Sequence, residues 1–283
     1  GVQILFLLLT HDYIIYLIIA VVFSFLTNWS ISRKVDKKYP ELKGTAEILP
    51  HEVKKSIFKN VRALAVYKIG SVVLNGTSNI MLSYLFNVTS VGLYSNYSLF
   101  TNFFQTVNSK TMGALTSSVG NLNTESDKDK QYAIFNQILF SSVWLNGFAA
   151  VGMALLVNDV ISIWIGNDYL FGKWTVFAIA FNYFIVTTSF ATYVFRTTLG
   201  LFKQGQFAPV FATILNIILG IVLGKWIGFP GVFLAIVLAR MLSTGIIDPI
   251  LVYRNAFKRP PLLYYFKYGG YILLMAILYI VIS

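Results

Sequence analysis

The sequence predicts an all-α integral membrane protein, a multi-span helical bundle with about eight complete transmembrane helices. Its 283 residues are 57% hydrophobic and only 12% charged, whereas an ordinary soluble domain has about 25% charged residues. The apolar residues also gather in blocks of about 20, the length that crosses a hydrocarbon core roughly 30 Å thick. A soluble chain of this composition could not cover its surface with polar groups, so lipid is the expected solvent.

The apolar blocks define the expected spans. They lie at 13–31, 63–86, 91–117, 132–157, 174–199, 207–226, 231–253 and 264–283. Residues 1–9 are too short to cross the membrane and are expected to end a helix that begins upstream. The last apolar run stops at Ser283 without a polar segment after it. Together the two ends predict an internal, central to C-terminal fragment of a longer protein.

Lys and Arg predict the orientation, because cytoplasmic loops are enriched in both. Nine of them fall between Arg33 and Arg62, and the later loops alternate between heavily and lightly charged. The loops expected in the cytoplasm are 32–62, 118–131, 200–206 and 254–263. The first of these is a basic linker. Its second half, residues 50–62, is either an interfacial amphipathic helix or a solvated linker.

Several kinds of site have no candidate residues in the sequence. Cysteine is absent, which excludes a disulfide framework and a thiolate nucleophile. The two histidines lack metal-ligand spacing, and no Walker sequence, paired carboxylates or nucleophile elbow is found. The net charge of +11 is explained by membrane topology. We therefore expect no enzyme activity, no catalytic residue, no metal, no cofactor and no nucleic-acid partner.

Two neighbouring predicted spans, 63–86 and 91–117, carry polar residues at helical spacing. Polar groups are costly in hydrocarbon, so two facing stripes favour a water-accessible cavity. Direct hydrogen bonding between the two helices is the alternative. The stripes consist of Lys68, Ser71, Asn75, Ser78 and Asn79 in the first span and of Ser98, Thr101, Asn102, Gln105 and Ser109 in the second.

Arg240 lies near the middle of the 231–253 span, where an arginine is costly unless it faces a partner or water. Its forked, permanently charged side chain suits a phosphate or carboxylate ligand; a structural ion pair is the alternative. Asp248, eight residues further along, lies off the same helix face. Arg196, near a span end, is expected to extend to the interface. For Lys68, both this interpretation and a place in the cavity stay open.

Four strings resemble bacterial polysaccharide (O-antigen type) flippases, which belong to the multidrug/oligosaccharidyl-lipid/polysaccharide exporter superfamily. The strings are YKIGSVVLNGTSNIMLSYLFNVTSVGLYSNYSLF at 67–100, the VGLYSNY turn within it, SVGNL at 118–122, and GLFKQGQFAPVFATILNIILGIVLGKWIGFPGVFLAIVLARMLS at 200–243. They occur in the order expected for the family. The resemblance covers essentially the whole chain.

The resemblance implies two six-helix lobes around a central cavity. Residues 1–31 would end the first lobe, 32–62 would be the cytoplasmic basic linker, and 63–253 would form the second six-helix lobe. Residues 254–283 would begin an additional C-terminal transmembrane helix. The family is expected to bind undecaprenyl-pyrophosphate-linked oligosaccharides at the cytoplasmic face of the bacterial inner membrane. It would release them outside by alternating access.

The resemblance also implies a substrate site. Arg240, in VLARMLS, matches a basic position of the family, and Arg196 is a weaker match. Relatives often carry an acidic residue around GTSNI, where this chain has Ser78 and Asn79, which speaks against cation coupling through this helix. The expected substrate-binding residues are Arg240, Lys68, Asn75, Asn79, Arg196, Asn102 and Gln105.

The expected partners are a lipid-linked oligosaccharide, the lipid bilayer, and polysaccharide polymerase or assembly proteins. Two other functions stay open. A cation-coupled drug antiporter of the same superfamily would be expected to place acidic residues in its cavity, and the predicted spans contain almost none. A membrane component of a polysaccharide assembly complex is the second alternative; a polymerase should have a large external loop with Arg or His clusters, and no such loop is predicted.

Overall fold

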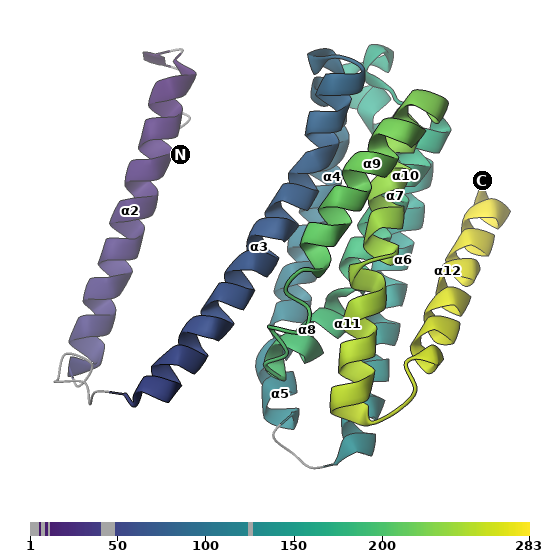
Figure 1. Cartoon of the computed structure of the whole chain (residues 1–283). Coiled ribbons are helices and arrows are strands. Elements are labelled where there is room, and N and C mark those ends of the chain that lie inside the picture. The colour runs from purple at the N-terminus through teal and green to yellow at the C-terminus, as the bar shows by residue number, and fades with distance from the viewer. Residues whose placement is uncertain (1–5, 7–8, 11, 41–48, 124–126) are drawn as a thin grey trace. The chain divides into compact units, whose positions relative to one another are not determined.

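The computed structural model is helical throughout the residues that it describes, namely 6, 9–10, 12–40, 49–123 and 127–283, apart from short turns and loops. In this part of the chain, six helical segments are long and apolar enough to cross a membrane. Figure 1 shows the helices along the chain. The predicted all-helical class is confirmed for the described residues, and the six segments are consistent with a helical membrane bundle. The six segments are Tyr13–Lys38, Lys128–Ile165, Lys173–Thr198, Ala208–Ile227, Phe229–Phe257 and Leu262–Ile282.

Two of the eight predicted spans are helices that are not apolar enough to join this set. They are α3 (His51–Leu85), with 35 residues, and α4 (Val88–Gly113), with 26 residues. Both are long enough to cross a bilayer. The polar stripes of these two helices lower their mean hydropathy. The residues that predict a cavity are therefore the same ones that make the two helices less apolar than the six candidate membrane spans.

The chain divides into two compact units, Gly1–Lys55 and Ser56–Ser283. The first unit contains α2 (Tyr13–Lys38). The second unit holds all of α3 except its first turn, followed by eleven described elements. These are α4, α5 (Leu115–Leu122), α6 (Lys128–Ile165), α7 (Lys173–Thr188), α8 (Phe190–Thr198), α9 (Ala208–Ile227), α10 (Phe229–Met241), α11 (Thr244–Val252), the π-helical turn η3 (Tyr253–Phe257) and α12 (Leu262–Ile282), together with the short 3-10 turn η2 (Asn167–Tyr169).

In the first unit, α2 extends about two turns beyond the predicted end at residue 31. Asp12 caps its start by accepting a hydrogen bond from the Ile14 backbone N–H at 2.7 Å. The helix continues through basic residues, of which Lys37 and Lys38 lie in the last turn, where cations interact favourably with the helix dipole. The predicted helix end at residues 1–9 falls mostly outside the described residues.

Residues 51–62 of the predicted linker form the start of α3, so this part of the segment is helical; its position at a membrane interface stays a prediction. Lys59, on this helix, lies beside Lys203 of the 200–206 turn. The pKa of Lys59 is lowered from its usual value, because its neutral amine can accept a hydrogen bond from Lys203 and because the charge of Lys203 repels its ammonium form. Two loops that the charge pattern predicts on one side of the membrane therefore meet.

α6 continues to Ile165, two turns beyond the predicted end at Val157. The polar residue Asn158 suggested a loop, but its side chain is fully engaged. It accepts a hydrogen bond from the Tyr97 hydroxyl at 2.7 Å and donates one to the carbonyl of Phe171 at 3.0 Å. The helix ends at Gly166, whose φ of 103° favours glycine.

Three predicted spans are divided into two helices each. The 91–117 span breaks after Gly113, the 174–199 span at Ser189, and the 231–253 span at Ser243. Before Ser189, hydroxyl groups turn back to the helix; Thr188 Oγ1, for example, donates to the carbonyl of Phe184 at 2.7 Å. Such bonds compete with helix geometry. Breaks of this kind are tolerated in a membrane where the backbone is buried in protein or lines a cavity.

An aromatic core ties one end of the second unit together. Phe135 of α6 is fully buried, and its ring lies 5.3 Å from Phe195, 5.6 Å from Tyr253 and 5.2 Å from Phe257. Tyr264 packs against the same ring at 6.4 Å. These rings join α6, α8, η3 and α12, and such pairs contribute about 0.5–1.5 kcal/mol each beyond the area that they bury.

α9 and α10, which Figure 1 labels as neighbouring helices, pack closely at Gly231. A Cβ at Gly231 would overlap the backbone carbonyl of Leu223.

Gly231→Ala is therefore expected to lower the free energy of unfolding by about 1–3 kcal/mol. Gly76→Ala is the matched control, because a Cβ there meets nothing within 4 Å and alanine favours the helix by up to about 1 kcal/mol. Equal thermal midpoints for both variants in detergent would contradict this close packing.

Candidate functional site

Two adjacent polar cavities lie within the second unit, each of about 250 Å³. Gln105 of α4 and Val186 of α7 line both of them. The other walls come from α3, α8, α9, α10 and α11, so segments that are far apart in the sequence enclose one polar region. A polar region of this size between membrane helices is a site where water or a polar ligand can be held.

The first cavity, here called the amide chamber, is lined mainly by neutral polar side chains. It contains amides and hydroxyls but no charged group. Asn182 Oδ1 is buried and has no hydrogen-bond partner among the residues that the structure describes. Groups of this kind both donate and accept hydrogen bonds, which suits a polyhydroxylated ligand. The polar residues are Asn75, Ser78, Tyr94, Thr101, Asn102, Gln105, Asn182 and Tyr183.

The second cavity, here called the charged chamber, contains both Arg240 and Asp248. Two of the three helix breaks, those at Ser189 and Ser243, border this cavity. Ser189 lines it directly, and so does Thr244, which follows Ser243. At the second of these breaks, the Ser243 hydroxyl donates to the backbone carbonyl of Ala208 at the start of α9. Because Ser189 and Thr244 line the chamber, both breaks lie at the cavity wall, where irregular backbone is tolerated in a membrane.

Arg240 connects the two chambers. Its Nη2 donates a hydrogen bond to Asn75 Oδ1 at 2.6 Å, and Asn75 lines the amide chamber while Arg240 lines the charged one. Arg240 Nε is buried and has no hydrogen-bond partner within the described ranges, nor does any carboxylate there lie within ion-pair distance of this guanidinium. Of its five N–H groups, one on Nη2 is therefore bonded to Asn75, and the guanidinium can still donate to a ligand.

Arg196 does not extend to the interface, so that prediction is wrong. Its side chain is 1% exposed, and its Nε lies 3.3 Å from Asp248 Oδ1. The guanidinium also stacks on Tyr67, with 4.0 Å between its central carbon and the ring centroid, and the Tyr67 hydroxyl donates to Asp248 Oδ2 at 3.3 Å. A buried arginine needs such a partner, because an unpaired charge is costly there.

The turn at 200–206 covers this ion pair. A Cβ at Gly205 would lie 2.7 Å from Arg196 Nη1 and 3.4 Å from Asp248 Oδ1, so the absence of a side chain at Gly205 leaves room for the two charged groups. Asp248 reaches the charged chamber, whereas Arg196 lies behind it and does not line either cavity. Arg196 therefore positions the carboxylate of Asp248.

A neutral hydrogen-bond network holds the cavity walls together. Asn146 of α6 donates to Asn108 Oδ1 of α4 at 2.9 Å and accepts from the Tyr183 hydroxyl of α7 at 2.8 Å. Asn146 and Asn108 are buried, and Asn108 and Tyr183 each line one of the two chambers. Satisfied buried polar groups of this kind specify how helices pack.

Four of the seven predicted site residues line the cavities: Arg240, Asn75, Asn102 and Gln105. Lys68 and Asn79 are exposed and line neither chamber, and Arg196 is the buried partner of Asp248.

Sequence reasoning missed Tyr67, Asp248 and Asn182. Asp248 does not share a helix face with Arg240, and its partner Arg196 lies on another element, so no pattern within its own helix indicates its role.

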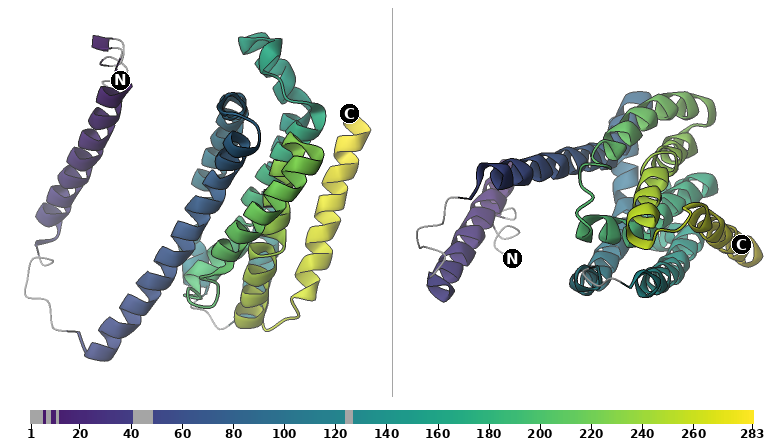
Figure 2. Two further views of the ribbon diagram at one scale, coloured as in Figure 1. Left: turned by 45° about the horizontal axis from the view of Figure 1, so that its top comes forward. Right: turned by 60° about the horizontal axis from the view of Figure 1, so that its bottom comes forward.

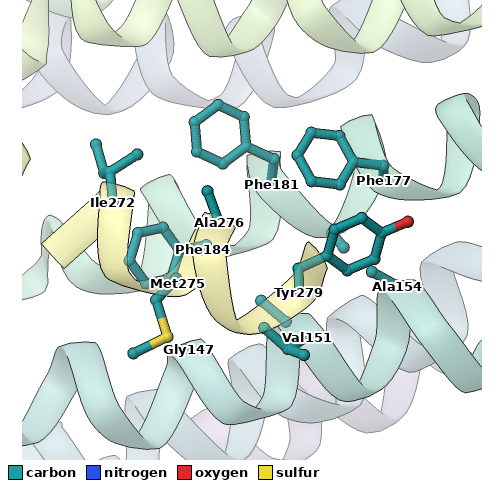
Figure 3. Close-up of a pocket in the computed structure, with 12 residues that line it drawn as sticks. Gly147, Val151, Ala154, Phe177, Phe181, Phe184, Ile272, Met275, Ala276 and Tyr279 are labelled. Atoms are coloured by element: carbon teal, nitrogen blue, oxygen red, sulfur yellow. The ribbon is translucent and has the colours of Figure 1, made fainter. Parts of the chain in front are cut away.

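A third cavity, of about 120 Å³, is apolar and lies between α6, α7 and α12. Figure 3 shows Met275 of α12 close to Gly147 of α6, with Phe177 and Phe181 of α7 on another side. A Cβ at Gly147 would lie only 2.5 Å from the Met275 sulfur. This cavity is a packing space between helices and has almost no polar group with which to orient a ligand.

The chain matches no protein-family model, no curated protein and no solved structure in the three comparisons with known proteins. The function is therefore argued from the residues that line the two chambers and from the sequence strings at 67–100, 118–122 and 200–243.

Proposed function

We propose that this chain is part of a membrane flippase that translocates lipid-linked oligosaccharides, carried on undecaprenyl pyrophosphate, for polysaccharide biosynthesis. One observation carries the proposal: Arg240 faces a polar cavity in a helical membrane protein, and no carboxylate of the described residues lies within ion-pair distance of it. A guanidinium in this setting needs an anion or water, and its fork fits the oxygens of a phosphate.

The two chambers fit the two halves of such a substrate. The charged chamber presents Arg240, which would contact the pyrophosphate, and the amide chamber presents neutral donors and acceptors such as Asn75, Asn102 and Gln105, which would contact sugar hydroxyls. The Arg240–Asn75 hydrogen bond lies where the two parts would join. A ligand that carries a charged group next to a polyol would therefore span both chambers.

The architecture in this proposal has eight complete spans. α3 and α4 cross the membrane and place their polar stripes on the cavity walls, and residues 63–253 form the second six-helix lobe of a two-lobe exporter in the bacterial inner membrane. The proximity of Lys59 and Lys203 supports a common, cytoplasmic side for the 32–62 and 200–206 loops. Alternating access requires that the substrate bind the inward-facing and outward-facing states with different free energies. Polysaccharide polymerase or assembly proteins are the proposed partners.

Asp248 favours a second candidate, a cation-coupled drug antiporter of the same superfamily. Its carboxylate lines the charged chamber, which is where an antiporter would hold a cation. Arg196, 3.3 Å away, already neutralises this charge, and Arg240 adds a positive charge to the same wall. The cavity thus favours an anionic ligand over a cationic one. No described feature specifically supports a polysaccharide polymerase.

Deleting the parent gene in its host tests the proposal. We expect one undecaprenyl-linked oligosaccharide to accumulate on the cytoplasmic leaflet and its surface polymer to be lost, and we expect the wild-type gene to restore both. Thin-layer or mass-spectrometric analysis of extracted lipids, combined with surface staining, measures these effects. Unchanged glycolipids together with altered sensitivity to cationic drugs would instead favour the antiporter.

A further inference from the structure

Lys267, near the start of α12, is held in a defined position at one end of the second unit. Its Nζ donates to the Tyr132 hydroxyl at 3.1 Å and to Asn136 Oδ1 at 3.0 Å, both on α6. The two acceptors are neutral, and no carboxylate within the described ranges lies at ion-pair distance from this ammonium. An ammonium has three donors, so Lys267 has one N–H left for a further acceptor.

A second cation lies next to Lys267. The Arg259 guanidinium stands 4.2 Å from the centroid of the Tyr132 ring, and Lys267 Nζ stands 5.1 Å from the same centroid. Arg259 Nη2 contacts Asp129 at 2.9 Å, but the Asp129 side chain is 85% exposed, so this pair is weak and screened by solvent. The two cations around Tyr132 give the junction of α6 and α12 a positive charge.

An aromatic surface continues from this junction along α6. Phe140, Trp144 and Phe148 follow Asn136 at intervals of four residues; the Phe140 and Trp144 rings are 5.9 Å apart, and the Trp144 and Phe148 rings are 5.3 Å apart. Phe140 is 49% and Phe148 is 56% exposed. They extend about 18 Å along the helix from Asn136, comparable with one leaflet of a hydrocarbon core about 30 Å thick.

α12, which packs beside α6, is itself mostly exposed. It lies at the edge of the second unit in both views of Figure 2, and only 6% of its apolar window is buried. Its start, at Leu262, follows the basic 254–261 segment, on the side that the charge pattern predicts to be cytoplasmic. That leaflet is the one rich in anionic lipids, and basic sites between membrane helices bind their headgroups.

We propose that the junction of α6 and α12 binds one anionic phospholipid, with its phosphate on Lys267 and Arg259 and an acyl chain along Phe140, Trp144 and Phe148. The positive charge of the junction selects the anionic headgroup, and the exposed aromatic surface next to it selects a lipid over a soluble phosphate. This site is separate from the two polar chambers, so the binding of a phospholipid here does not depend on the proposed flippase function.

The test is native mass spectrometry of the purified protein titrated with dioleoyl-phosphatidylglycerol and, separately, with dioleoyl-phosphatidylcholine. Lys267→Gln is expected to weaken the first phosphatidylglycerol binding event about fivefold, because one basic residue contributes about 1 kcal/mol to such binding. Lys267→Arg, which keeps the charge, should retain most of the binding. Lys225→Gln, which removes an exposed lysine from the last turn of α9, is the matched control and should bind as the wild type does.

Equal phosphatidylglycerol binding by the wild type and Lys267→Gln would overturn the proposal, and so would equally strong, saturable binding of phosphatidylcholine. An excess of inorganic phosphate is expected to leave the lipid bound; displacement by phosphate would show a simple anion site without a lipid contact. Lys267 is exposed, so the variant should fold, and an unchanged thermal midpoint verifies that it does.

Discussion

Asp248→Ala is expected to lower the free energy of unfolding by about 3–5 kcal/mol, the cost of leaving a buried charge without its partner. Arg196 is 1% exposed and would lose the carboxylate that lies 3.3 Å from its Nε. Tyr67 would lose the acceptor of its hydroxyl at the same time. Denaturant or thermal unfolding in detergent, followed by intrinsic fluorescence, measures the change.

Two further variants separate this effect from a general loss of charge. Asp129→Ala removes the partner of Arg259 in an exposed pair and should cost at most about 1 kcal/mol. The double variant Arg196→Met/Asp248→Leu removes both buried charges and should recover much of the stability that the single variant loses. If Asp248→Ala were as mild as Asp129→Ala, the buried ion pair would not hold α8 and α11 together.

Arg240→Gln is expected to reduce glycan export by about 10- to 100-fold while leaving the stability nearly unchanged. A hydrogen bond to a charged group contributes about 1.5–3 kcal/mol, and each 1.4 kcal/mol is a factor of ten. Stability should be preserved because no described carboxylate is left unpaired when Arg240 is neutralised. Complementation of the deletion strain, with export measured as surface polymer per amount of membrane protein, gives the result.

Arg240→Lys and Lys68→Gln provide the comparison. Lysine keeps the charge but lacks the planar fork that pairs with phosphate, so Arg240→Lys should give an intermediate loss. Lys68 lies outside both chambers, so Lys68→Gln should export nearly normally, and Arg240→Gln/Lys68→Gln should resemble Arg240→Gln. Unchanged export by that double variant would contradict the role of Arg240.

The class of fold and much of the cavity could be predicted from the sequence, because both depend on patterns within single helices. Blocks of apolar residues predicted the membrane helices, and the polar spacing on α3 and α4 predicted two walls of the cavity. Asn75, Asn102 and Gln105 line the chambers as those stripes suggested. Lys68 and Asn79 belong to the same predicted stripe but line neither chamber. The spacing of polar residues therefore predicts the helix face, but not which residues of that face reach the cavity.

What could not be predicted depends on contacts between helices that are distant in the sequence. Arg196 and Asp248 are separated in the sequence by two turns, at 200–206 and at Gly228, and by the helix break at Ser243, and neither residue alone indicates the other. Asn158 likewise suggested a loop, although Tyr97 and Phe171 satisfy its side chain within a helix. In both cases a polar side chain looked exposed in the sequence because its partner lies on another element.

The most direct test of the account is the labelling of single cysteines on α4 with a membrane-impermeant maleimide. The chain has no cysteine, so each variant carries one thiol. Asn102 lines the amide chamber, whereas its neighbour Phe103 is 62% exposed on an apolar surface with Leu99 and Trp164. The account predicts that Asn102→Cys is labelled and that added lipid-linked oligosaccharide protects it, while Phe103→Cys, which faces lipid, is not labelled. Equal labelling at both positions, or labelling of Asn102→Cys that the glycolipid does not reduce, would contradict a substrate-binding cavity within the membrane.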